Sequence, residues 1–321
     1  MRRYLPVGAA ALVVVVLALV FANPVALDVL FFMLIYAVLG QGWNWISGYG
    51  GQVSFGHALF FGCGAYASAV FALHSLSPWL ALVAGVAVAL VLAVGIGLPC
   101  FTLRKHYFSI ATIAVAAIGE IVVRNTDFLG GSSGIEMPIE PSSLANLQFS
   151  YKLPYVALAL LLFVAVQAAT LYFEDSRIGY YLRAIRANQD AAASVGIDGR
   201  RWKLVAFAGG ACFCALAGSL YAQSTLFVDP ESVLSLGISI AIALVGVVGG
   251  VGSVWGPALG AVIYIFLSKY VAALLGGSGR GIDLIIYGGL IVLVAAVRPG
   301  GLAGALAPLF RKRKLARRKL A

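Results

Sequence analysis

The feature that most constrains this chain is a series of long apolar runs. Residues 9–22 and 153–170 are apolar on every face of a helix, and about 20 such residues cross a bilayer. Of the 321 residues 62% are hydrophobic and 11% are charged, whereas about half of a soluble domain is apolar. The sequence therefore predicts an all-α, polytopic membrane protein. Soluble enzymes, disordered proteins and disulfide scaffolds are excluded, and so are membrane barrels, whose strands alternate apolar and polar residues.

Ten segments have the length and composition of membrane spans. Proline supports three of the predicted starts, because a proline in the first turn of a helix loses no hydrogen bond; these are Pro78, Pro154 and Pro257. The predicted spans are residues 7–23, 27–46, 57–74, 79–101, 107–124, 154–173, 204–223, 236–254, 257–275 and 282–298.

The basic residues predict the orientation of these spans. They concentrate at the N-terminus, at 104–105, in a loop at 174–203 and in a tail at 301–321. Lysine and arginine near span ends stay in the cytoplasm, and an even number of spans puts all four segments on one side. Acidic residues mark the opposite loops: Asp127, Glu136, Glu140, Asp229 and Glu231. We expect both termini to be cytoplasmic, and the net charge of +10 to meet lipid headgroups rather than nucleic acid.

Three regions follow from this pattern. Residues 1–26 hold the first span, whose Met1-Arg2-Arg3 start and apolar run also resemble a signal peptide. The run is longer than a usual signal core, which favours a retained span. Residues 27–300 form the transmembrane domain, with the loop at 174–203, and residues 301–321 form a basic cytoplasmic tail.

A polar, glycine-rich segment at residues 48–57 lies between two apolar runs. Irregular backbone at membrane depth is tolerated only where protein or a water-filled cavity satisfies its polar groups. The segment therefore indicates a translocation pathway, and its candidate lining residues are Gln52, Ser54, Gly56 and His57. The alternative is a tight turn in which glycine supplies positive φ angles.

Ionisable groups within spans are costly and usually functional or paired. Glu120 is a second pathway candidate, but Arg124 follows one helical turn later and favours a structural ion pair. His57 has the alternative of capping or bonding a neighbouring helix. Lys269 has the alternative of extending outward to the headgroups.

A second glycine cluster at residues 246–256 occupies a comparable place in the second half of the chain. Spans two to five would run in the opposite sense to spans seven to ten. This arrangement suggests an inverted repeat, as many transporters contain.

No enzyme constellation or cofactor motif is found in the sequence. It lacks the phosphate loop that binds ATP, the paired histidines of zinc hydrolases and a nucleophile elbow. The four cysteines stand at no metal-ligand spacing. We predict no catalytic residue, no metal and no cofactor in this chain, and a histidine-based membrane enzyme is disfavoured because His57 has no second catalytic group.

The loop at 174–203 predicts a contact with another protein. Residues 180–195 can form one helix that ends at Gly196, outside the membrane. Arg183 and Arg186 share one face of this helix. Several alanines give it a surface of small side chains, which another protein could approach closely. The alternative is an ordinary loop helix at the headgroups.

Four separated stretches resemble one known family, the LivM/LivH permeases of branched-chain amino acid ABC importers. The stretches are SRIGYYLRAIRANQDAAASVGID at 176–198, GGQVSFGHALFFGCGAY at 50–66, GGSSGI at 130–135 and GGVGSVWGP at 249–257, with Tyr107-Phe108, Thr112 and Glu120-Ile121 between them. The similarity extends over residues 27–300, and the order of the motifs is closer to LivM.

The resemblance implies a permease of the type II ABC importer kind in a bacterial inner membrane. Its partners would be a homologous LivH-like permease, two ABC ATPase subunits that bind ATP, and an extracytoplasmic solute-binding protein. The loop would dock on the ATPase through residues that include Gly179, Arg183, Ala184, Arg186, Asn188, Ala191, Ala192 and Gly196.

Three departures bear on the solute. Tyr180-Tyr181 and Gln189 stand where small or acidic residues are more frequent, and Leu129 stands where threonine is usual. Urea or another small polar solute is therefore an alternative to leucine, isoleucine and valine. An ion-coupled secondary transporter is a further alternative, disfavoured because the spans hold no paired carboxylates.

Overall fold

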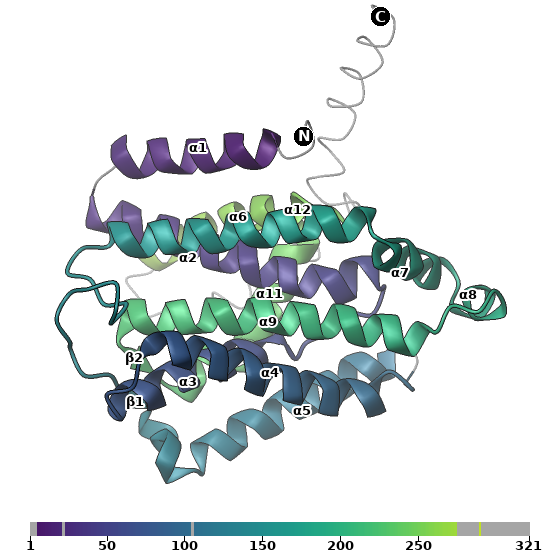
Figure 1. The fold of residues 1–321 in the computed structure, drawn as a ribbon, viewed down its shortest axis with the longest axis horizontal. Coiled ribbons are helices and arrows are strands. Elements are labelled where there is room, and N and C mark those ends of the chain that lie inside the picture. The colour runs from purple at the N-terminus through teal and green to yellow at the C-terminus, as the bar shows by residue number, and fades with distance from the viewer. Residues whose placement is uncertain (1–4, 21–22, 104–105, 275–288, 290–321) are drawn as a thin grey trace, which may run out of the picture.

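The structure is a computed structural model that describes residues 5–20, 23–103, 106–274 and 289. Apart from residue 289, the tenth predicted span at 282–298 lies outside the described residues, and so does the basic tail at 301–321. The described part is a bundle of long helices (Figure 1).

The bundle consists of helices joined by short connections. The long helices are α1 (Leu5–Val20), α2 (Pro24–Trp43), α3 (His57–Leu73), α4 (Pro78–Cys100), α5 (His106–Arg124), α6 (Leu153–Asp175), α9 (Gly199–Thr225), α11 (Leu236–Gly249) and α12 (Gly256–Leu274). The shorter elements are the π-helix η1 (Asn44–Tyr49), the 3-10 turns η2 (Asp127–Leu129) and η3 (Gly131–Ser133), the helices α7 (Arg177–Ala187), α8 (Gln189–Ser194) and α10 (Pro230–Val233), and the strands β1 (Ile135–Glu136) and β2 (Phe227–Val228).

Each of the first nine predicted spans coincides with one apolar helix. In the described part of the chain, six helices are long and apolar enough to cross a membrane: Pro24–Tyr49, Pro78–Cys100, His106–Arg124, Leu153–Asp175, Gly199–Thr225 and Pro230–Gly249. Three shorter apolar helices correspond to the other three of these nine predicted spans: Pro6–Val20, His57–Leu73 and Gly256–Lys269. The prediction of an all-α polytopic protein is confirmed, and the inverted repeat stays a prediction.

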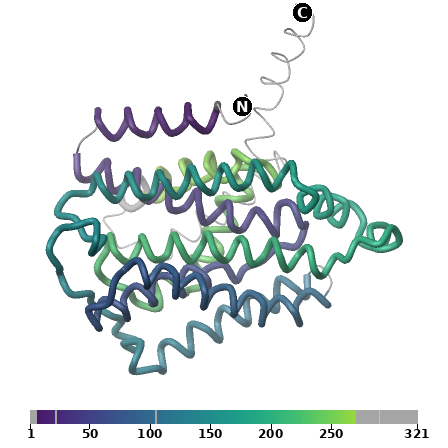
Figure 2. Tube along the Cα trace, viewed as in Figure 1, coloured from purple at the N-terminus to yellow at the C-terminus, as the bar shows by residue number. Residues whose placement is uncertain are grey.

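Glycine allows the central helices to touch backbone to backbone. A Cβ atom on Gly64 of α3 would lie 1.8 Å from the Ala215 carbonyl oxygen of α9, and one on Gly218 of α9 would lie 1.9 Å from the Phe61 oxygen of α3. Ser219 donates a hydrogen bond to the Gly64 carbonyl at 3.0 Å. Such close approach is how helices associate in lipid, where no hydrophobic force drives them together. By contrast, α1 lies along one edge of the bundle, against α2 and α6 (Figure 2).

The two ends of the bundle differ, and we name them by what they carry (Figure 1). At the sheet end, β1 and β2 pair antiparallel, with Ile135 opposite Val228 and Glu136 opposite Phe227. At the loop end, α7 and α8 project beyond the long helices.

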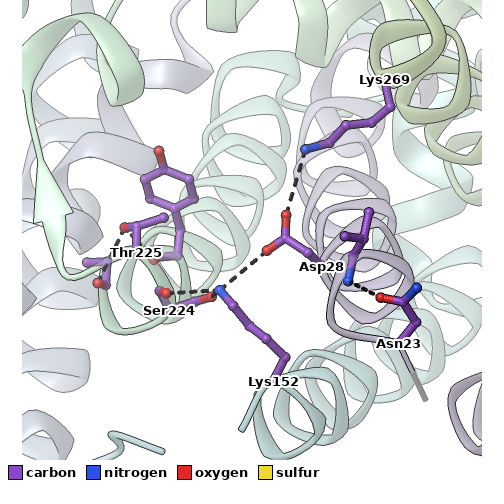
Figure 3. Close-up of polar contacts among 9 residues, drawn as sticks. Asn23, Asp28, Lys152, Ser224, Thr225 and Lys269 are labelled. Carbon is purple, nitrogen blue, oxygen red and sulfur yellow. Dashed lines mark hydrogen bonds and ion pairs between the residues drawn. The ribbon is translucent and has the colours of Figure 1, made fainter. Parts of the chain in front are cut away.

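A charge cluster of Asp28, Lys152 and Lys269 ties helices together near the sheet end (Figure 3). Asp28 of α2 lies 3.3 Å from Lys152 Nζ and 3.7 Å from Lys269 Nζ of α12. Lys152 also donates to the carbonyl and the hydroxyl of Ser224 in the last turn of α9, both at 3.2 Å. Lys269 is therefore paired within the protein, and half of its side chain is exposed.

Candidate functional site

The segment at residues 50–56 is irregular backbone, as predicted, and side chains bond backbone polar groups of residues 53–55. The Ser54 carbonyl accepts a hydrogen bond from the Trp43 indole N–H at 2.8 Å, and the Ser54 backbone N–H donates to the Ser47 hydroxyl at 3.2 Å. The Phe55 N–H donates to Thr112 Oγ1 at 3.1 Å. Ser109 donates to the Val53 carbonyl at 2.6 Å. Helix α5 thus supports the segment from one side and α2 from the other.

Replacing Thr112 by valine should lower the free energy of unfolding by about 1–3 kcal/mol. The shape is kept and Thr112 itself is buried, but the half-buried Phe55 N–H loses its acceptor, and leaving such a donor unpaired costs about that much. The measurement is the thermal unfolding of the purified protein in detergent. Thr126→Val is the matched control, because Thr126 lies just beyond α5 and its hydroxyl donates to the Val122 carbonyl of that helix in a solvent-exposed bond. Equal melting temperatures for the two variants would refute this role of Thr112.

The structure brings four of the predicted pathway residues together and leaves the fifth apart. Gln52, Ser54 and His57 are buried, and Gly56 directly precedes α3. Glu120 lies eight residues beyond Thr112, about 12 Å along α5 at the rise of an α-helix.

His57 is fully buried, and aromatic rings pack against its imidazole. The imidazole meets the rings of Phe60 and Phe207 edge to face, with centroids 6.0 and 5.8 Å away. A cavity of about 10 Å³ lies beside Gly56 and Thr112. Glu120 instead forms an ion pair with Arg124 at 2.7 Å, the structural arrangement that the spacing favoured.

The predicted loop helix is two helices, so the expectation of one helix over residues 180–195 is wrong in this respect. Asn188 is extended, and its side chain accepts the N–H groups of Asp190 and Ala191 at 3.0 and 3.1 Å. This N-cap ends α7 and begins α8, because asparagine competes with the backbone for hydrogen bonds. Gly196 follows α8 with a φ of +85°, which a residue with a side chain rarely adopts.

A small hydrophobic core anchors the loop to the membrane helices. Leu182 and Ile185 of α7 and Ala192 of α8 are buried against Tyr49, Phe173 and Ala206. Two of the predicted docking residues are therefore internal: Ala192 belongs to this core, and a Cβ on Gly179 would lie 2.4 Å from the Phe173 oxygen. The other side of α8, including Ala191 and Val195, is exposed.

Charged side chains fix the loop further. Arg183 donates to the Glu174 carbonyl at 2.8 Å and lies 3.7 Å from its carboxylate. The buried Lys203 of α9 donates to Gln189 Oε1 of α8 at 2.7 Å. Both bonds hold α7 and α8 to the helices that precede and follow them.

The two glycine clusters and the loop meet at the loop end, in what we call the junction: Asn44, Gly48, Gly51, Arg186, Gly252 and Ser253. Asn44 donates to the Ser253 carbonyl at 2.9 Å and accepts the Gly252 N–H at 2.8 Å. Arg186 donates through Nη1 to the Gly48 carbonyl. The end of α2, the turn after α11 and the end of α7 are therefore in direct contact.

Comparison with known proteins identifies the family. Residues 25–295 match the model of the family described as the branched-chain amino acid transport system / permease component. The chain belongs to this permease family. The LivM permease protein of Escherichia coli K12 is 30% identical over 303 residues, covering 86% of this chain and 69% of its own.

Further relatives carry the same family name. The LivM protein of Salmonella typhimurium is 29% identical, over 86% of this chain and 69% of its own. The LivH protein of the same organism is 25% identical, over 84% of this chain and 91% of its own. No solved structure matches the chain. The protein is a multi-pass membrane permease, as its sequence motifs implied.

Reasoning from the sequence missed Asn44, the bond of the buried Lys203 to Gln189, and the pairing of Asp28 with Lys152 and Lys269. Asn44 and Asp28 both lie inside apolar runs, where a polar side chain needs a partner in the protein. The free-energy cost of burying an unpaired polar side chain was therefore the signal in the sequence that could have identified both residues. Among the described residues, no three His, Cys, Asp or Glu side chains gather into a metal site.

Proposed function

We propose that this chain is the permease subunit of an ATP-binding-cassette importer and forms the membrane pathway for leucine, isoleucine and valine. Its family and the names of its LivM and LivH relatives support this assignment. The observation that carries the mechanism is the pair α7 and α8, which project from the bundle while their own core binds them to α6, α9 and η1. A rigid projection of this kind suits a partner that moves the membrane helices.

The partner at the loop end is an ATPase subunit in this proposal. ATP is bound and hydrolysed by a pair of such subunits, so this chain needs no cofactor and catalyses no reaction itself. The docking surface is the outer side of α7 and α8, with the exposed Asn188, Ala191 and Gly196 and the partly buried Arg183 and Ala184. A homologous LivH-like permease and an extracytoplasmic binding protein complete the importer.

The proposed orientation puts the loop end in the cytoplasm and the sheet end outside a bacterial inner membrane. Arg177, Arg183, Arg186, Arg200 and Arg201 belong to the segment at the loop end, whereas Glu136 and Asp229 belong to the sheet end. This distribution agrees with the positive-inside rule and supports the proposal that both termini are cytoplasmic.

Substrate selection falls mainly to the binding protein in this scheme. The candidate pathway residues Gln52, Ser54, Gly56 and His57 carry no pair of opposite charges that could hold both ends of an amino acid. They offer amide, hydroxyl and imidazole groups at a site that opens when the helices around it move. Glu120 is paired with Arg124 and lies nearer the sheet end, at the outer part of the proposed pathway.

Uptake of radiolabelled leucine by proteoliposomes tests the function. The vesicles contain this chain, its partner permease and both ATPase subunits, with or without ATP inside and the binding protein outside. We expect accumulation only when all components and ATP are present. Gradient-driven uptake by this chain alone would instead establish a secondary transporter, and ATP-dependent uptake of urea but not leucine would correct the solute.

A further inference from the structure

Within the junction, Arg186 forms a direct hydrogen bond between the loop and the bundle. Arg186 lies in the last turn of α7 and reaches the Gly48 carbonyl, 138 residues away in the chain. A Cβ on Gly51 would lie 2.7 Å from Arg186 Cγ, and one on Gly252 would lie 2.7 Å from Nη1. Both glycines have positive φ angles, +72° and +81°. The backbone of both clusters is thus shaped around this one side chain.

Electrostatics favours a cation at this place. Gly48 lies in the last turn of η1, which continues α2, and Gly252 lies three residues beyond the end of α11. The final carbonyl groups of a helix lack partners within the helix and carry partial negative charge. The Arg186 guanidinium therefore sits where the negative ends of two membrane helices converge.

Asn44 makes these two helix ends a single unit. Its amide bonds both the Gly252 N–H and the Ser253 carbonyl, and Gly48 packs so closely that a Cβ there would lie 1.9 Å from Asn44 Oδ1. A displacement of the Gly48 carbonyl is consequently transmitted to the turn between α11 and α12. The two halves of the chain are therefore linked next to the Gly48 carbonyl, to which Arg186 donates a hydrogen bond.

We propose that Arg186 is a positioning residue that transmits the movement of α7 and α8 to both halves of the bundle through the Gly48 carbonyl and the Gly252 turn. This inference rests on the proposed function, in which an ATPase moves the loop. Leu182 and Ile185 keep α7 attached to the bundle by non-directional packing. The guanidinium adds a directional bond, so the junction follows α7 as it moves.

Arg186→Met tests this role, because methionine keeps part of the side-chain length and removes the charge and the donors. The complete importer is purified, and three quantities are measured: copurified ATPase subunits, ATP hydrolysis, and leucine uptake in proteoliposomes. We expect the ATPase subunits to remain bound and to hydrolyse ATP, while the leucine transported per ATP falls about tenfold, as for a residue that carries coupling between sites. Arg186→Lys keeps the charge and a donor. Its leucine transport per ATP should lie between the values of Arg186→Met and the wild type.

Two further variants make the test specific. Gly252→Ala should cause the same loss with Arg186 intact, since its Cβ would displace the guanidinium. Lys152→Met is the matched control, because Lys152 also donates to a carbonyl in the last turn of a helix, but at the sheet end. We expect its transport per ATP to stay at the wild-type value.

Each other outcome overturns a defined statement. An unchanged ratio in Arg186→Met would refute the transmitting role, and loss of the ATPase subunits from that variant would make Arg186 a docking residue instead. Absence of ATP-dependent uptake by the wild-type importer would refute the proposed function itself, which the wild-type arm reports separately.

Discussion

Valine in place of Gly64 should abolish the accumulation of folded protein in the membrane. The new Cβ would lie 1.8 Å from the Ala215 oxygen, 2.6 Å from its carbonyl carbon and 2.9 Å from its Cα. All three are backbone atoms of α9, so no side chain can rotate away. Helices α3 and α9 would have to separate, and the bond from Ser219 to the Gly64 carbonyl would be lost with them.

The expected cost is at least about 3 kcal/mol, the upper part of the range for overpacked cores, and it removes much of the stability of a typical protein. The measurement is size-exclusion chromatography of a fluorescent fusion extracted from membranes. Gly95→Val in α4 is the matched control, because no atom lies within 4 Å of a Cβ placed there. A monodisperse peak of wild-type height for Gly64→Val would show that the two helices are not packed this closely.

Glutamate in place of Ala191 should abolish ATP-dependent uptake and release the ATPase subunits from the purified importer. Ala191 is exposed and lies three residues after the N-cap Asn188, where glutamate is favoured in helices. The change therefore suits α8 itself while it adds bulk and charge to the proposed docking surface. A change at an important interface position lowers the binding free energy by about 2 kcal/mol or more, which corresponds to a loss of about 30-fold in affinity.

The copurified ATPase is quantified on gels, and uptake is measured with the same preparations. Ala145→Glu provides the control, since Ala145 is an exposed alanine in the segment between β1 and α6. We expect this variant to keep both its ATPase subunits and its uptake. Normal ATPase binding in Ala191→Glu would move the docking surface away from α8.

The membrane helices could be predicted from the sequence because apolar run length follows the thickness of the bilayer. The same logic explains an error in one predicted span boundary at the loop end. We predicted a span from residue 204, whereas α9 begins at Gly199, where Asp198 accepts the N–H groups of Arg200 and Arg201 at 3.0 and 3.2 Å. Hydropathy measures the buried length of a helix, and the polar first turn lies outside it.

The candidate site could be predicted only in pieces. Both glycine clusters and Arg186 stood out in the sequence for separate reasons, yet their meeting depends on helix packing across more than a hundred residues. No local periodicity encodes such a contact. Asn188 was different, because an asparagine followed by a short helical run is a recognisable N-cap, and that local signal could have divided the loop helix correctly.

The length of α2 determines where in the bilayer the junction lies. At 1.5 Å per residue, its 20 residues already match the hydrocarbon core, which is about 30 Å thick. In the proposed orientation, the π-helix from Asn44 to Tyr49 therefore continues α2 toward the cytoplasmic headgroup layer. A guanidinium costs little at that depth, whereas it is expensive at the bilayer centre. In this arrangement the permease keeps the junction and its bridging arginine at the membrane surface, and the segment that leads from there to His57 holds no Asp, Glu, Lys or Arg.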